Sequence, residues 1–93
     1  MITYTDANKR QYMRMFFDGE DAEFCTTVIS VLRIEKKYKI LLRYRYVENL
    51  SDKEIAREMK LSPDYINKQM NVALKVSYDA LKHTPIRAFS TTE

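Results

Sequence analysis

Apolar residues recur at three- and four-residue steps along most of this chain, which is the spacing of amphipathic helices. The pattern is clearest in residues 50–74, where two such runs are separated by a short break. In the first run, Ile55, Ala56 and Met59 share one face of a predicted helix. In the second run, one face is formed by Ile66, Met70, Ala73, Leu74, Ser77 and Leu81. Two short-linked helices with a small residue, Ala56, at the expected crossing point indicate a helix-turn-helix.

Both runs begin with residues that favour the first turn of a helix. Ser51 is a good N-cap, and Glu54 lies at the N3 position that completes a capping box. Ser62 is the second expected N-cap, because Pro63 follows it at the first helical position. The predicted helices are about 52–59 and about 63–82.

A further helix is predicted near the N-terminus. Thr5 or Asp6 can cap it, and it is expected to end near Asp18, just before the only glycine, Gly19. Its predicted apolar stripe is Tyr12, Met15 and Phe16, with Lys9, Arg10 and Arg14 toward solvent.

Two more helices are predicted between this one and the helix-turn-helix. One opens with acidic residues, which favour a first turn, and its expected inward face is Phe24, Val28, Val31 and Leu32, with Cys25 and Ile29 beside them. The other covers residues 35–47, with Tyr38, Leu41, Leu42 and Tyr46 (or Arg45) inward. Its basic outer side is either a solvated surface or a contact for phosphate or an acidic partner.

Composition supports an all-α class. One glycine and two prolines leave little material for turns, and 45% of the residues are hydrophobic, which suits a small globular domain. The net charge of +3 is unevenly distributed, because residues 1–23 carry −2 and residues 33–93 carry +5. A basic excess on the half that holds the helix-turn-helix fits a nucleic-acid surface.

The sequence lacks the residue groups of an enzyme. It has one cysteine, Cys25, one histidine, His83, and no glycine-rich phosphate loop, so neither a metal site nor a cofactor is implied. His83 is expected to be a helix-terminus residue. No run approaches the roughly 18 apolar residues of a membrane span, and the N-terminus lacks an apolar signal core. We therefore expect a cytoplasmic protein that is not an enzyme.

Three segments share the order and spacing of a known family. They are LLRYRYVENLS (41–51), KEIAREMKLS (53–62) and the apolar positions of YINKQMNVAL (65–74). In these segments the chain resembles region four of bacterial sigma factors and the small phage or mobile-element transcription regulators built on it. Quorum-sensing regulators of the LuxR type are a weaker resemblance. The resemblance implies a single helix-turn-helix domain over 1–93, with an N-terminal helical extension (1–33), a tri-helical core (34–82) and a tail (83–93).

This resemblance implies a DNA-binding transcription regulator whose recognition helix, about 63–82, enters the major groove of double-stranded DNA. Helical geometry turns one set of polar side chains away from the apolar face. The predicted base contacts are Asp64, Tyr65, Asn67, Lys68 and Asn71. The predicted phosphate contacts are Ser51, Lys53, Arg57, Lys60, Ser62 and Lys75. A single module of this size reads few base pairs, so a homodimer or a second protein is a further expectation.

The chain departs from the family pattern in two places, and the second departure, together with the acidic N-terminal half, favours an alternative function. Lys60 stands where the family often has glycine, and the recognition helix offers lysines rather than arginines. The second departure lowers the DNA affinity expected of the isolated chain. The alternative function is a region-four mimic that binds RNA polymerase or another regulatory protein.

Overall fold

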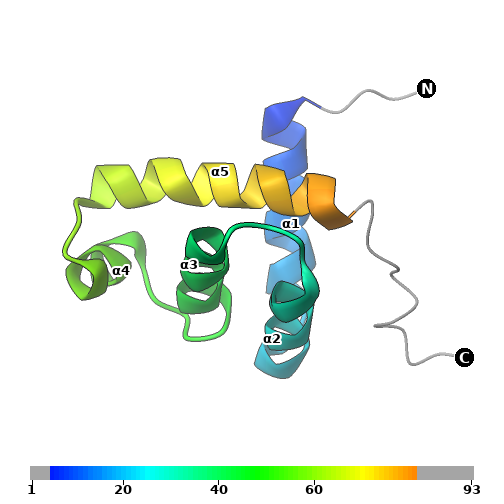
Figure 1. Ribbon diagram of the computed structural model, residues 1–93, viewed down its shortest axis with the longest axis horizontal. Coiled ribbons are helices and arrows are strands. Elements are labelled where there is room, and N and C mark those ends of the chain that lie inside the picture. The colour runs from blue at the N-terminus through cyan, green and yellow to red at the C-terminus, as the bar shows by residue number, and fades with distance from the viewer. Residues whose placement is uncertain (1–4, 82–93) are drawn as a thin grey trace, which may run out of the picture.

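The computed structural model describes residues 5–81, which form five α-helices and no strand. The helices are α1 (Asp6–Asp18), α2 (Ala22–Val31), α3 (Lys36–Tyr46), α4 (Asp52–Met59) and α5 (Pro63–Leu81) (Figure 1). The predicted all-α class and the number of helices are confirmed. Lys82, His83 and the predicted tail lie outside the described residues, as do residues 1–4.

Side-chain caps begin four of these helices, as their sequences predict. The Thr5 hydroxyl accepts a hydrogen bond from the backbone N–H of Asn8 at 3.2 Å, and the Asp21 carboxylate accepts one from Phe24 at 2.8 Å. Ser51 and Glu54 form the complete capping box of α4. The Ser62 hydroxyl accepts from the N–H of Tyr65 at 3.1 Å and so caps α5.

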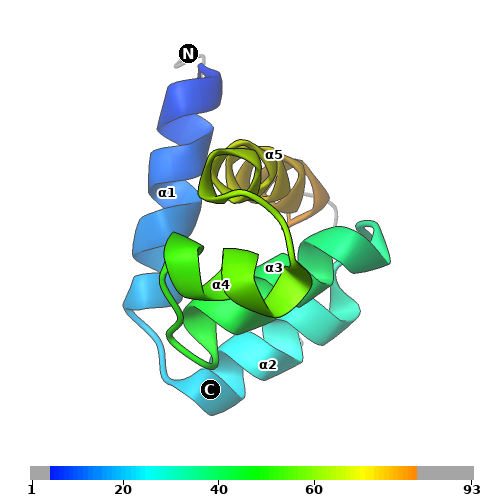
Figure 2. The same cartoon turned by 90° about the vertical axis from the view of Figure 1, so that its left-hand side faces the viewer.

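The longest helix, α5, is the element against which α1, α3 and α4 all pack. In Figure 1, α5 runs horizontally, α3 and α4 lie below it, and α1 crosses behind its second half. Figure 2, turned by 90°, confirms that α1 flanks α5 on one side and that α4 lies beneath its start. The first half of α5 and all of α4 therefore project beyond α1, whereas α2 packs against α3.

One hydrophobic core joins all five helices. Its fully buried members include Phe17 of α1, Ile29 of α2, Leu42 of α3, Ile55 of α4 and Ile66 of α5. The Phe17 ring stacks on Tyr46 with the ring centroids 4.9 Å apart, and burial raises the pKa of the Tyr46 hydroxyl. The N-terminal helices thus share their core with the helix-turn-helix.

The predicted inward stripe of α1 is wrong by one residue. Met13 and Phe17 are buried, whereas Tyr12 is 47% exposed and Met15 is 65% exposed. Phe16 is partly buried. The position of α5 explains this difference. The face of α1 that packs on α5 is the face that carries Lys9 and Arg14. These two side chains were predicted to be solvated, but they donate to Asp79 and Asn71 of α5.

The predicted inward position of Val31 is also wrong. Val31 is 47% exposed, whereas the next residue, Leu32, which was also predicted to face inward, is buried. Val31 is the last residue of α2, and the backbone of Leu32 is already extended. The change of backbone direction at this point turns Leu32 inward. The other predicted positions of this helix, Cys25, Val28 and Ile29, are buried.

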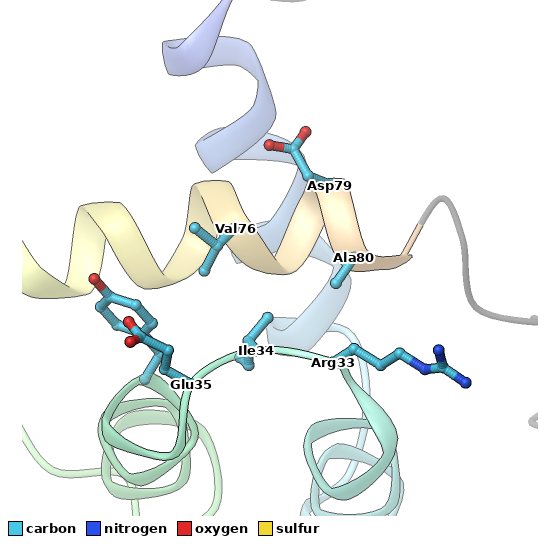
Figure 3. Close-up of a pocket in the computed structure, with 7 residues that line it drawn as sticks. Arg33, Ile34, Glu35, Val76, Asp79 and Ala80 are labelled. Carbon is cyan, nitrogen blue, oxygen red and sulfur yellow. The ribbon is translucent and has the colours of Figure 1, made fainter.

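A hollow of about 660 Å³ opens between the segment before α3 and the last turns of α5 (Figure 3). We call it the α3–α5 hollow; it is lined by Arg33, Ile34, Glu35, Tyr38, Val76, Asp79 and Ala80. Arg33 and Asp79 point away from it, so apolar side chains dominate its interior. In this view α1 lies behind α5, and the hollow is therefore on the other flank of α5.

The position of the α1 stripe can be tested with a matched pair of methionine variants. Met13→Ala should lower the free energy of unfolding by about 3 kcal/mol, because it leaves a cavity in a closed core. Met15→Ala removes the same atoms from an exposed site and should change that free energy by no more than about 0.5 kcal/mol. Urea denaturation followed by circular dichroism measures both. Equal effects of the two variants would contradict the observed orientation of α1.

Candidate nucleic-acid interface

The turn between α4 and α5 is short and has a defined backbone. Lys60 adopts a left-handed conformation, with φ 59° and ψ 45°, directly after the last residue of α4. The N–H of Leu61 donates to the carbonyl of Ala56 at 2.9 Å, which satisfies a carbonyl at the end of α4. Ala56 is buried, as expected for the small residue at the crossing. Helices α4 and α5 therefore have the geometry of a helix-turn-helix.

The predicted base contacts all lie in the first half of α5, away from the buried residues of that helix. Asp64, Asn67 and Lys68 are exposed, Asn71 is partly buried, and Tyr65 is 47% exposed. Most of this half of α5 extends beyond α1, which meets it at Asn71, and these side chains form one accessible polar surface. We call the surface formed by Asp64, Tyr65, Asn67, Lys68 and Asn71 the polar face of α5.

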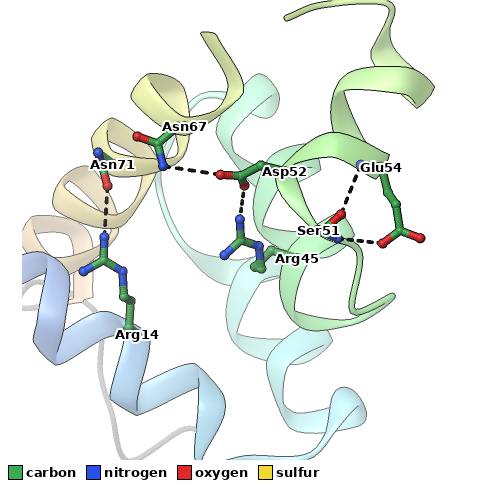
Figure 4. Close-up of polar contacts among 7 residues, drawn as sticks. All are labelled: Arg14, Arg45, Ser51, Asp52, Glu54, Asn67 and Asn71. Carbon is green, nitrogen blue, oxygen red and sulfur yellow. Dashed lines mark hydrogen bonds and ion pairs between the residues drawn. The ribbon is translucent and has the colours of Figure 1, made fainter. Parts of the chain in front are cut away.

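One amide of this face is held by the start of α4. The Nδ2 group of Asn67 donates to Oδ2 of Asp52 at 3.3 Å (Figure 4). The other carboxylate oxygen of Asp52, Oδ1, accepts a charged hydrogen bond from Nη2 of Arg45 in α3. Three helices are thereby linked through a single carboxylate. No contact of Asp52 was predicted from the sequence, and Arg45 was predicted only as an alternative to Tyr46 on the inward face of its helix.

The second amide of the polar face is held by α1. Nη2 of Arg14 donates to Oδ1 of Asn71 at 3.0 Å, across 57 residues of sequence (Figure 4). Two ion pairs join the same helices further along, Lys9 with Asp79 at 3.2 Å and Lys75 with Asp6 at 3.9 Å. No helical periodicity connects residues this far apart, so the sequence alone had no signal for these contacts.

The predicted phosphate contacts divide into two groups. Lys53, Arg57 and Lys60 are exposed on or just after α4. Lys75 instead lies beside α1, where it is paired with Asp6. The Ser51 backbone N–H donates to the Glu54 carboxylate at 2.9 Å, and this bond lowers the pKa of Glu54. A phosphate at Ser51 would therefore have to displace that carboxylate.

Residues 5–81 contain neither a cluster of metal-binding side chains nor a reactive thiol. These residues contain no set of three or more histidine, cysteine or acidic side chains that could hold a metal ion. Cys25 is buried, and burial raises the pKa of its thiol, which disfavours the reactive thiolate. No helix in the same range is long and apolar enough to cross a bilayer.

Comparisons with known proteins leave the resemblance to sigma region four as a hypothesis. Neither a protein-family model, nor a curated protein, nor a solved structure matches this chain. The function proposed below therefore depends on the geometry of the helix-turn-helix and of the polar face of α5.

The strain at the turn can be measured with variants of Lys60. Lys60→Gly should raise the free energy of unfolding by about 0.5–1 kcal/mol, because glycine adopts φ 59° without the steric cost of a side chain. Lys60→Ala is the matched control, since it removes the long side chain but keeps the Cβ atom. Thermal and urea unfolding compare the three proteins. A glycine variant no more stable than the alanine variant would contradict a left-handed residue at this turn.

Proposed function

We propose that this protein is a DNA-binding transcription regulator and that α5 enters the major groove of double-stranded DNA. The observation that supports this most directly is the combination of a helix-turn-helix with an unobstructed polar face. The first half of α5 exposes Asp64, Asn67 and Lys68 and projects beyond the helix that packs on its second half. Insertion of the first part of a recognition helix is the usual geometry of such modules.

The side chains of the polar face suit the edges of bases. Lys68 can donate to the acceptors of guanine, and Asp64 can accept from the amino group of cytosine. Asn67 and Asn71 carry amides of the kind that contact adenine. On or just after α4, Lys53, Arg57 and Lys60 provide positive charge for the phosphates that border the groove. The net charge of +5 on residues 33–93 is consistent with this placement.

One such module contacts too few base pairs for stringent control of a promoter. The absence of arginine from α5 further limits affinity, because arginine makes the commonest specific contact with guanine. We therefore propose that DNA is bound with a second copy of the chain or together with another protein.

A second candidate function is a region-four mimic that binds RNA polymerase or another regulator. The α3–α5 hollow favours this candidate, because Ile34, Tyr38 and Val76 present apolar surface on a flank that the polar face does not use. Apolar concave surface of this kind suits protein contacts better than it suits phosphates. In this case the chain would bind duplex DNA weakly on its own.

The first proposal predicts the behaviour of a double variant. Replacing Asn67 and Lys68 by alanine should weaken binding to a selected duplex by at least about thirtyfold, since two base contacts at about 1–3 kcal/mol each together contribute about 2 kcal/mol or more. The melting temperature should change little, because both side chains are exposed. Fluorescence anisotropy at several salt concentrations measures the affinity.

Arg33→Ala is the charge-matched control, because it removes one exposed positive charge beside the last turns of α5, at the end of that helix opposite to the polar face. Its affinity for the selected duplex should stay within about twofold of the wild-type affinity, because a single distant charge contributes little at physiological ionic strength. Equal affinity of the double variant and the wild type for every duplex would exclude base recognition by α5. Retention of RNA polymerase by a chain that does not bind DNA would favour the second candidate.

A further inference from the structure

The two asparagines of the polar face are held by opposite ends of their amide groups. Asn67 uses its nitrogen, because the Asp52 carboxylate that it meets can only accept hydrogen bonds. Asn71 uses its oxygen, because the Arg14 guanidinium that it meets can only donate. Figure 4 shows the consequence: the Asn67 oxygen points away from Asp52, and the Asn71 nitrogen points away from Arg14.

Each orientation is fixed by a charged partner, and the partner of Asn67 is itself held. Arg45 donates to the other oxygen of Asp52, and both members of that pair are partly buried. The Arg14–Asn71 bond is partly buried as well. Turning the Asn67 amide over would place its oxygen against a carboxylate, and turning the Asn71 amide would place its NH₂ group against a guanidinium. Each reversal would replace a charge-assisted hydrogen bond by a repulsive contact.

We propose that Asp52 and Arg14 are specificity-determining residues, because they make Asn67 an acceptor and Asn71 a donor toward the major groove. This inference depends on the proposed DNA-binding function and deepens it. An unconstrained asparagine contacts adenine with both ends of its amide. Here one N–H of Asn67 and one lone pair of Asn71 are already engaged within the protein, and the opposite end of each amide points away from that partner. The Asn67 oxygen and the Asn71 NH₂ group are therefore the ends offered to a base.

The two positions then have different base preferences. The free oxygen of Asn67 can accept from the amino group of adenine or cytosine, but guanine and thymine present only acceptors in the major groove. The free NH₂ group of Asn71 can donate to guanine, thymine or N7 of adenine, but cytosine presents only a donor there. The N-terminal helix α1, through Arg14, thereby influences which base is accepted at a position that it does not contact.

Binding-site selection from random duplex DNA tests this with the full chain and matched variants. In the wild type, the position facing Asn67 should prefer adenine or cytosine by roughly tenfold, and the position facing Asn71 should exclude cytosine to a similar degree. Asp52→Asn should relax only the first preference, because its amide can donate as well as accept and no longer fixes Asn67. Asp52→Glu keeps a carboxylate and should restore that preference.

At the second position, Arg14→Gln should admit cytosine, because glutamine lets Asn71 turn over. Arg14→Lys offers only donors and should keep cytosine excluded. Thermal unfolding identifies any variant that fails to fold, and the Asp52 and Arg14 pairs test the inference independently of each other.

The possible outcomes distinguish failure of this inference from failure of the proposed DNA-binding function. A wild type that selects a sequence, with Asp52→Asn and Arg14→Gln each relaxing only its own position, supports the inference. A selected sequence with unchanged base preferences in both variants overturns it and leaves the DNA-binding function intact, even if affinity falls uniformly. A wild type that enriches no sequence overturns both.

Discussion

The fold depends on the burial of one face of α5 along its whole length. Residues of this face are in the core from Ile66 at the start of the helix to Leu81 at its end. None of the other helices in residues 5–81 is as long as this stripe, so α4 packs on its first part, α3 on its middle and α1 on its second half. Burial of Ser77 within the stripe is tolerated because its hydroxyl donates to the carbonyl of Ala73 at 2.6 Å.

This arrangement leaves α5 with two different halves. Its second half is fixed by α1 through the ion pair of Lys9 with Asp79 and the aromatic contact of Tyr12 with Tyr78. Its first half packs on α4, lies beside Lys37 and Leu41 of α3, and exposes polar side chains on the other side. The parts of α5 that are ion-paired with α1 and the parts that expose polar side chains therefore lie in different halves of one helix. The hydrogen bonds of Asn67 and Asn71 connect the polar face to the helices that pack on α5, because their partners, Asp52 and Arg14, belong to α4 and α1.

Local patterns predicted the helices, their caps and the helix-turn-helix, since these depend on neighbouring residues such as Ser51 with Glu54. The left-handed conformation at Lys60 falls at the position where the family that the chain resembles often has glycine. The inward face of α1 was not predicted, because Met13 and Met15 are equally apolar and only the position of α5 distinguishes them. The partners of the polar face were missed for the same reason: Arg14 and Asn71 are adjacent only after folding.

The central claim is that the polar face of α5 is the surface that contacts DNA. The most direct measurement is a titration of isotope-labelled protein with a short DNA duplex, followed through its backbone amide NMR signals. If the polar face contacts DNA, the largest shifts occur at residues 51–54, at the start of α4, and at residues 62–71, at the start of α5. The residues that line the α3–α5 hollow should then be unaffected. Shifts concentrated at the hollow, or none at saturating DNA, would contradict this claim.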